Sequence, residues 1–204
     1  MDAPLVILLI GFVYIVLFGG LSLLRREGLS IRFAFEALVL TLAGALLVWA
    51  TGISIHPVFF LLFIYVITMR IRLMVDIANT FARRGNYSSA DKVYGMAEHL
   101  WTDQTNRMIL SVNQGALRLH QGALDESISI FKNILAQSDR GFLGIRYESA
   151  AHYNLGVAYH RKGLESLAIA EFNNVLDIWP ASEYARAAAN AIARHKENQG
   201  QNQD

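Results

Sequence analysis

The chain has 204 residues, of which 53% are hydrophobic, and its mean hydropathy is +0.30. The formal net charge is only +1, so no bulk basicity points to nucleic-acid binding. There is no cysteine, which excludes disulfides, thiol catalysis and cysteine metal sites from this sequence. Only six acidic or basic side chains lie between Met1 and Met69. The sequence therefore divides into an apolar domain, residues 1–70, and a remainder of ordinary soluble composition.

The first predicted element is a membrane-spanning helix over residues 3–24. Its 22 residues carry no charge, and 15 of them are Leu, Ile, Val or Phe. A bilayer core of about 30 Å requires roughly 20 helical residues, so this segment is long enough to cross it. Asp2 stands where a signal peptide would have Lys or Arg, and the apolar stretch is too long for one, which favours a retained helix.

A second uncharged stretch, residues 37–69, is too long for a single span and is interrupted by "TGISIHP". Gly52 and Pro57 favour a turn there, and proline suits the first position of a helix. The sequence therefore predicts two further membrane helices, over 33–51 and 57–70. A re-entrant hairpin over residues 33–69 is the alternative.

The segment after Pro57 contains no glycine or proline before Gly85. We therefore expect the third membrane helix to continue without a break into the first helix of the next domain. A rigid mounting of that domain on the membrane would follow.

Arginines are distributed unequally between the connections. The first connection contains Arg25, Arg26 and Arg32, the second contains none, and the third helix is followed by Arg70, Arg72, Arg83 and Arg84. Because positively charged loops stay in the cytoplasm, this distribution predicts an N-terminus outside and a C-terminal domain inside. The predicted location is a bacterial inner (plasma) membrane.

The region after the apolar domain shows a regular pattern of small and aromatic residues. The pattern is clearest as His152-x2-Leu155-Gly156-x2-Tyr159, followed by Ala168-x3-Phe172 and Pro180. It resembles the tetratricopeptide repeat (TPR) family, whose pattern is W-x2-L-G-x2-Y, A-x3-F and P over about 34 residues. Small residues permit close helix crossing, and Gly163 is expected to separate the two helices of the repeat.

Two weaker copies precede this repeat. One contains Gly115, Gly122, Ser127 and Phe131 at the same offsets, and the other contains Ala78, Phe81, Gly85, Ala90, Tyr94 and Ala97. The apolar stretches and the resemblance together predict an all-α protein: three N-terminal transmembrane helices, then an α-solenoid of about three TPR hairpins and a C-terminal capping helix. The expected TPR domain covers 71–196, with repeats at 71–104, 108–141 and 149–182, a capping helix at 181–196 and a disordered tail at 197–204.

The sequence contains no P-loop, Rossmann glycine pattern or HExxH motif. We expect no catalytic, cofactor or metal site, and therefore no enzyme. Among the tryptophans, Trp49 is expected to anchor a helix at the membrane interface. Trp101 and Trp179 are expected to pack inside the repeat domain.

The TPR family binds peptides or helices on a concave surface lined by the first helix of each repeat. The resemblance therefore implies a partner-binding groove whose candidate residues are Arg72, Asn79, Arg83, Asn113, His120, Tyr153, Val157, His160 and Arg161. This lining contains arginines but no Asp or Glu, which favours an acidic peptide or a C-terminal segment of a protein partner. Membrane lipid is the other expected partner, and no nucleic acid is expected.

The function that the resemblance implies is a membrane-anchored scaffold or adaptor, expected to assist assembly or maintenance of a membrane protein complex. The alternative is a stoichiometric accessory subunit whose transmembrane helices are its main interface with other transmembrane subunits. Small residues at Gly19–Gly20 and Ala43–Ala45 would allow close helix packing in that case.

Overall fold

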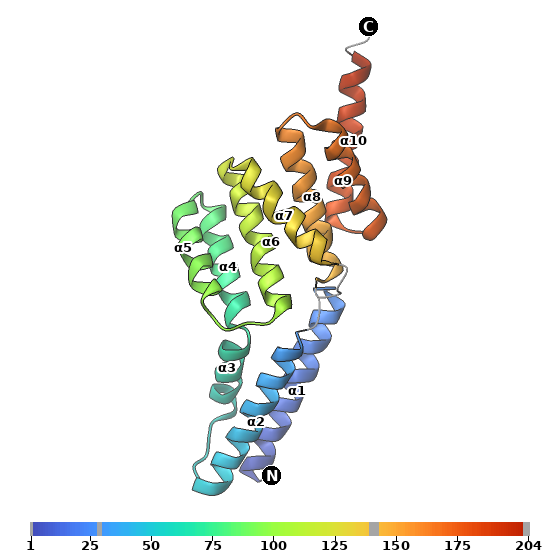
Figure 1. The fold of residues 1–204 in the computed structure, drawn as a ribbon. Coiled ribbons are helices and arrows are strands. Elements are labelled where there is room, and N and C mark those ends of the chain that lie inside the picture. Colours follow the sequence, from blue (N-terminus) through green and yellow to red (C-terminus); the bar gives the residue numbers. More distant parts are fainter. Residues whose placement is uncertain (1, 28–29, 139–142, 202–204) are drawn as a thin grey trace.

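The computed structural model describes residues 2–27, 30–138 and 143–201, and all the regular elements in this part of the chain are α-helices (Figure 1). They are α1 (Ala3–Leu24), α2 (Ile31–Thr51), α3 (Pro57–Thr68), α4 (Arg70–Arg83), α5 (Tyr87–Glu98), α6 (Gln104–Gln121), α7 (Leu124–Ser138), α8 (Ile145–Arg161), α9 (Glu165–Ile178) and α10 (Glu183–Gln201). The predicted all-α class is confirmed for these residues.

The first two helices pack against each other, and each is long and apolar enough to cross a membrane (Figure 1). With 22 and 21 residues, each extends about 30 Å at 1.5 Å per residue. Their close approach does not use Gly19 and Gly20, where an added Cβ would meet no other part of the protein within 4 Å. It uses Gly11 instead, where an added Cβ would overlap the Thr41 side chain.

The third apolar helix, α3, has only 12 residues and follows an extended segment, residues 53–56. Figure 1 shows this segment returning from the end of α2 toward the rest of the molecule before α3 begins. At about 18 Å, α3 alone is shorter than a bilayer core. By length and composition, two helices can therefore cross a membrane on their own, or up to three if the bent pair of α3 and α4 is counted as one span.

The expectation of an unbroken third helix is wrong. The helix ends at Thr68, Met69 has φ −100° and ψ 8°, and α4 is bent by 74° from α3. The break needs no glycine or proline, because Thr68 Oγ1 donates to the carbonyl of Ile64 (2.8 Å), a bond that often bends helices. Arg70 also donates to the carbonyl of Ile67 (2.5 Å) and so satisfies a helix-end acceptor.

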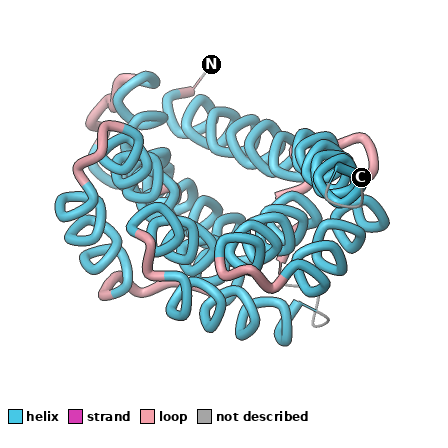
Figure 2. Tube along the Cα trace, turned by 90° about the horizontal axis from the view of Figure 1, so that it is seen from above, coloured by secondary structure: helices cyan, strands magenta, loops and turns pink. Residues whose placement is uncertain are grey.

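Three helix pairs follow, α4 with α5, α6 with α7 and α8 with α9, and α10 packs against the last pair. Seen from above, the pairs follow one another along a curved row (Figure 2). The turn inside each pair contains a glycine with positive φ, namely Gly85 (75°), Gly122 (80°) and Gly163 (74°). Glycine is favoured at these turns because other residues adopt this left-handed conformation at a steric cost.

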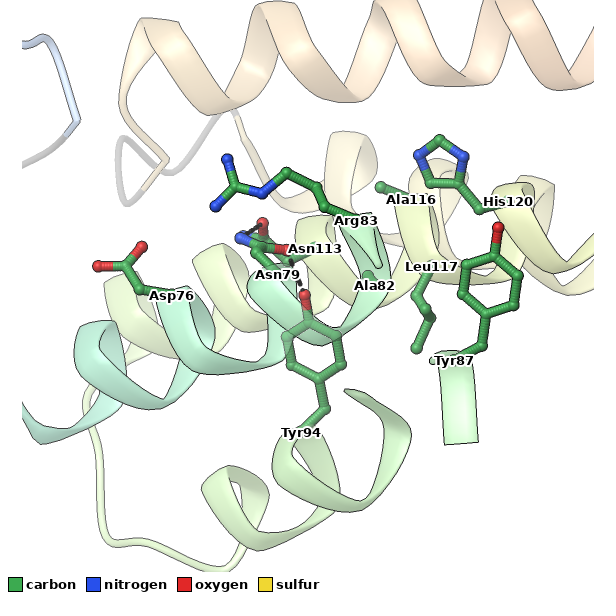
Figure 3. Close-up of a pocket in the computed structure, with 10 residues that line it drawn as sticks. All are labelled: Asp76, Asn79, Ala82, Arg83, Tyr87, Tyr94, Asn113, Ala116, Leu117 and His120. Atoms are coloured by element: carbon green, nitrogen blue, oxygen red, sulfur yellow. Dashed lines mark hydrogen bonds between the residues drawn. The ribbon is translucent and has the colours of Figure 1, made fainter. Parts of the chain in front are cut away.

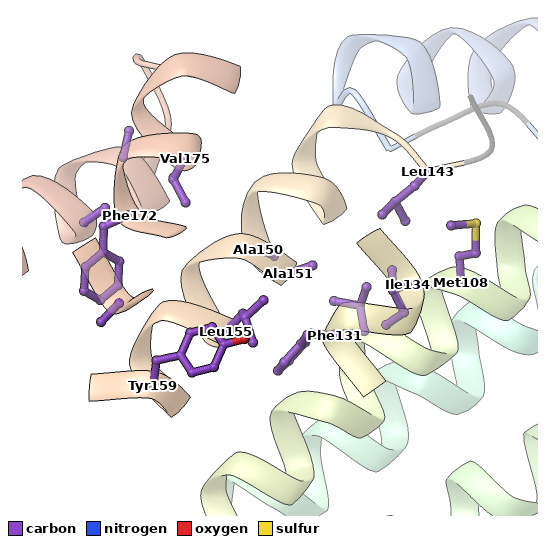
Figure 4. Packing of buried hydrophobic residues seen from close by; sticks show 14 residues of the cluster. Met108, Phe131, Ile134, Leu143, Ala150, Ala151, Leu155, Tyr159, Phe172 and Val175 are labelled. Atoms are coloured by element: carbon purple, nitrogen blue, oxygen red, sulfur yellow. The ribbon is translucent and has the colours of Figure 1, made fainter. Parts of the chain in front are cut away.

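The second and third pairs are packed in the same way. A Cβ at Gly115 would lie 2.8 Å from the ring of Phe131, and one at Gly156 would lie 2.7 Å from the ring of Phe172. Both rings are buried within one apolar cluster that extends from α6 to α10 (Figure 4). Ala168, next to Gly156, is 1% exposed, so this crossing has no space for a larger side chain.

Helix α10 is longer than expected. The sequence predicted a capping helix over 181–196 and a disordered tail over 197–204, but the helix begins at Glu183 and continues to Gln201. The expectation is wrong for residues 197–201, and residues 202–204 lie outside the described part. Extending an existing helix through polar residues needs no new nucleation, which explains why a polar sequence alone does not end it.

Candidate functional site

A hollow of about 460 Å³ lies between α4, α5 and α6 (Figure 3). Its lining residues are Asp76, Asn79, Ala82, Arg83, Tyr87, Tyr94, Asn113, Ala116, Leu117 and His120. The residues of α4 and α6 come from the first helices of two successive pairs. The sequence placed four of them, Asn79, Arg83, Asn113 and His120, in one groove, and the structure brings these four together.

Two amides and a phenol form a hydrogen-bonded chain at the centre of this hollow. Tyr94 Oη donates to Asn79 Oδ1 (2.6 Å), Asn79 Nδ2 donates to Asn113 Oδ1 (2.9 Å), and Asn113 Nδ2 donates to the carbonyl of Ile109 (2.7 Å). Burial raises the pKa of the Tyr94 phenol, so it remains a neutral donor. This series of hydrogen bonds links α4, α5 and α6 and holds both amides in fixed orientations.

Charged groups stand beside the amides. Asp76 is exposed near the middle of α4, and the side chain of Arg83, from the last turn of the same helix, extends back over Asn79 and Asn113, while His120 of α6 lies on the other side of Ala116 (Figure 3). No ion pair involves Arg83 within the described residues. The expected lining without Asp or Glu is therefore wrong. Asp76 could have been predicted from the sequence, because positions 76, 79 and 83 share one helix face at spacings of three and four.

The other predicted groove residues lie elsewhere and have partners. Tyr153 packs against the rings of Phe172 and Tyr184, with both centroid distances at 5.9 Å, and Val157 packs against the same apolar cluster. Arg161 donates to the carbonyl of Leu119 (3.0 Å). Two further polar residues that were predicted to line the groove are paired elsewhere. His160 contacts Glu165 (2.9 Å), and Arg72 contacts Glu27 (2.5 Å).

A second polar cluster joins the apolar helices to the helix pairs. Glu27, in the connection between α1 and α2, is only 5% exposed and binds both Arg72 (2.5 Å) and Arg146 (2.9 Å). The backbone N–H of Arg146 donates to the carbonyl of Arg26 (3.1 Å), and Ser30 Oγ donates to Asp103. One connection thus contacts the starts of α4, α6 and α8.

The same cluster continues along α2. Glu36 accepts from Arg32 (2.5 Å) and from both terminal nitrogens of Arg70 (2.7 and 3.0 Å). Arg70 also donates to the carbonyl of Trp101 (2.9 Å), and the Arg32 guanidinium lies 3.6 Å from the centroid of the Trp101 indole. We call this set the junction: residues 25–27 and 30–36 with Arg70, Arg72, Trp101, Asp103 and Arg146.

The junction explains why two helices begin earlier than the repeat pattern predicts. Helix α6 begins at Gln104 rather than near 108, and α8 begins at Ile145 rather than near 149. The earlier starts place Asp103 at the N-cap of α6, where it accepts from the N–H of Asn106 (3.0 Å), and Arg146 in the first turn of α8. Repeat matching missed both residues, because they precede the repeat motif.

Within the described residues, no three His, Asp or Glu side chains are grouped as metal ligands would be. Comparison of the sequence with protein-family models gives no match, and neither curated proteins nor solved structures match the chain. The candidate site is therefore described from the structure alone. It is a polar hollow between helix pairs, which the junction joins to the apolar helices.

Proposed function

We propose that the chain is a membrane-anchored TPR scaffold or adaptor that binds another protein, without catalysis, and assists assembly or maintenance of a membrane protein complex. The observation that carries this proposal is the hollow between α4 and α6, whose amides are fixed while Arg83 and His120 are exposed beside them. Fixed polar groups in a concave surface suit recognition, because little ordering remains to be done on binding.

The TPR assignment is supported by the packing of the pairs. Gly115 and Gly156 lie at equivalent places against Phe131 and Phe172, as the shared spacing of the motif requires. Each pair turns at a glycine with positive φ. One such pair leaves an apolar face uncovered, and stacking of successive pairs buries it.

We propose three membrane passages, with the N-terminus outside and the helix pairs in the cytoplasm of a bacterium. The end of α1, the start of α2 and the end of α3 lie toward the helix pairs (Figure 1), and this end carries Arg25, Arg26, Arg32 and Arg70. Because the chain has no native cysteine, Ser54→Cys and Asn173→Cys are single-cysteine variants. An impermeant thiol reagent should label the first and not the second in whole cells; the reverse pattern would invert the topology.

The partner segment that we propose is an acidic peptide or a free C-terminus, with its carboxylate at Arg83 and His120. Arginine binds carboxylates through two parallel donors. Arg83→Glu should reduce capture of the partner in a mild-detergent pull-down of the full chain. Arg84→Glu is the matched control, because Arg84 is the exposed neighbouring arginine and does not line the hollow. Equal capture by both variants would exclude the Arg83 end as the binding site.

A second candidate function, an accessory subunit, is favoured by an apolar hollow of about 390 Å³ between α2 and α3. Its walls include Gly44 and the aromatic rings of Phe59, Phe60 and Phe63. Such a surface would suit a transmembrane helix of another subunit. Quantified stoichiometry in the same pull-down separates the two functions: near 1:1 recovery with a stable complex favours the subunit, and substoichiometric capture of precursors favours the assembly factor.

A further inference from the structure

Among the residues that the structure describes outside the apolar helices, Trp101 is the most exposed Phe, Tyr or Trp, at 79%. The sequence led us to expect that it packs inside the repeat domain, and this expectation is wrong. It lies in the connection between α5 and α6, at the end of the helix pairs that faces α3 (Figure 1). An indole is costly to expose to water, so a reason for its position is required.

The exposure is imposed by the surrounding contacts. Arg70 holds the Trp101 carbonyl (2.9 Å) and is itself held by Glu36, while the Arg32 guanidinium covers one face of the ring at 3.6 Å. The next residue, Thr102, is only 8% exposed. With its backbone fixed on both sides, the connection presents the other face of the indole outward.

Arg32, whose guanidinium covers the indole, is flanked on α2 by residues that a membrane would cover. Ile31 and Phe35 stand on either side of Arg32 in the first turns of α2 and are 79% and 64% exposed. They belong to a helix that is long and apolar enough to cross a bilayer. Arginines of the junction lie at the same level, as expected where phospholipid headgroups begin.

We propose that Trp101 is a membrane-interface anchor, inserted at the boundary between headgroups and acyl chains together with Ile31 and Phe35. An indole suits this depth because it combines a large apolar surface with one N–H donor. The phospholipid interface is thus a direct binding partner of the helix-pair region. This inference rests on the proposed membrane anchorage of α1 and α2.

The anchor would set the orientation of the hollow. Trp101 is joined through Arg70 to the start of α4, and α6 begins three residues after it, at Gln104. Two of the three helices that line the hollow, α4 and α6, therefore start from one contact with the membrane. Their opposite ends, with Arg83 and His120, point away from it, so a partner segment would be bound at a fixed height above the lipid.

The chain contains only three tryptophans, which allows a direct test with the full-length protein. The variant Trp49→Phe/Trp179→Phe retains Trp101 as the only indole. After reconstitution in phosphatidylcholine vesicles, its fluorescence should be quenched several-fold more by lipids brominated near the headgroup than by a water-soluble quencher. Lipids brominated near the chain end should quench it less than the headgroup-proximal ones. Circular dichroism of each variant verifies that the helices are intact.

Two further single-tryptophan proteins serve as controls. One retains only Trp49, which lies on α2 and should be quenched by brominated lipid if that helix is inserted. The other has all three tryptophans replaced by Phe and carries Tyr87→Trp. Tyr87 is the first residue of α5, at the end of the helix that is far from the proposed membrane contact, so brominated lipid should have no effect there. If Trp101 behaves like Tyr87→Trp while Trp49 is quenched, the interface anchor is wrong and the membrane anchorage stands. If Trp49 is not quenched either, the anchorage is wrong, and the anchor with it.

Discussion

The helix pairs and the junction are stabilised by different chemistry. The pairs are held by apolar packing, in which Phe131 and Phe172 each cover a glycine of the preceding helix. The junction is held by arginine–carboxylate contacts around the buried Glu27 and the partly buried Glu36. Apolar packing of the same shape can recur in successive helix pairs. In the junction, in contrast, Glu27 and Glu36 each accept hydrogen bonds from their own particular arginines. The first arrangement recurs in the second and third helix pairs, and within the described residues the carboxylate cluster of Glu27 and Glu36 is found at the junction.

This difference also separates what a mutation removes in each region. A truncated core side chain loses transfer free energy and leaves a cavity. A neutralised carboxylate in the junction leaves arginines without their counter-charge, while the apolar contacts around them stay intact. The first change should weaken the helix pairs themselves, and the second should separate them from the apolar helices.

The largest effect is expected for Phe131→Ala. The ring is 0% exposed and packs on Gly115, so its loss should lower the free energy of unfolding by about 3–5 kcal/mol. Phe12→Ala is the matched control, because Phe12 is 65% exposed on α1. Denaturant unfolding of the full chain in detergent, followed by circular dichroism, measures both. A similar small loss for both variants would mean that the pairs are not held by this core.

Glu27→Gln should have the next largest effect. Glu27 is 5% exposed and binds Arg72 and Arg146, and its neutral replacement should cost about 2–3 kcal/mol, a value reduced from fully buried pairs because both arginines are partly exposed. Hydrogen exchange should rise at the start of α8, where the Arg146 N–H is bonded to the connection. Faster exchange across α6 and α7 as well would indicate that the junction is not a separate unit.

The same contrast explains how far the sequence could be interpreted. The turn glycines and the pairing of Gly156 with Phe172 follow a fixed spacing, so one clear repeat was enough to locate the others. Glu27 and Arg146 are 119 positions apart, and no local pattern connects them. The break at Met69 was missed for a similar reason, since Thr68 and Arg70 act there through side-chain bonds. In the hollow, Asp76 was missed although its helix spacing indicated it.

A pH titration tests the junction from another side. Burial raises the pKa of the Tyr147 phenol to about 12, and the Glu27 carboxylate adds to the shift while Arg72 and Arg146 oppose it. The native phenol holds its proton more tightly than an unfolded one. The resulting contribution of Tyr147 to the stability of the folded state is therefore complete below pH 10. It is lost as pH rises toward 12, and the shift corresponds to about 2–3 kcal/mol.

Tyr147→Phe should therefore reduce the loss of stability between pH 10 and 12. Some loss should remain, because burial also raises the pKa of Tyr94. Tyrosinate absorbance and circular dichroism, followed together against pH, give the ionisation and the unfolding of both proteins. Identical alkaline transitions for wild type and variant would show that Tyr147 ionises without cost and is not buried beside the junction.

The smallest effect is expected for Lys162→Ala. Lys162 contacts Asp125, and this pair joins the turn between α8 and α9 to the first turn of α7. Chemically it resembles the contacts of Glu27, but its side chains are 34% and 86% exposed. In water the attraction is largely offset by the entropy of ordering two mobile side chains, so the cost should be below about 0.5 kcal/mol. Salt should remove even this small effect, because the screening length falls from about 10 Å at 0.1 M to about 3 Å at 1 M.

Denaturant unfolding of Lys162→Ala at both salt concentrations, with Glu27→Gln in parallel, compares an exposed pair with a buried one in the same chain. A loss above about 1 kcal/mol for Lys162→Ala that persists at high salt would show that burial is not what distinguishes the junction from the surface of the helix pairs.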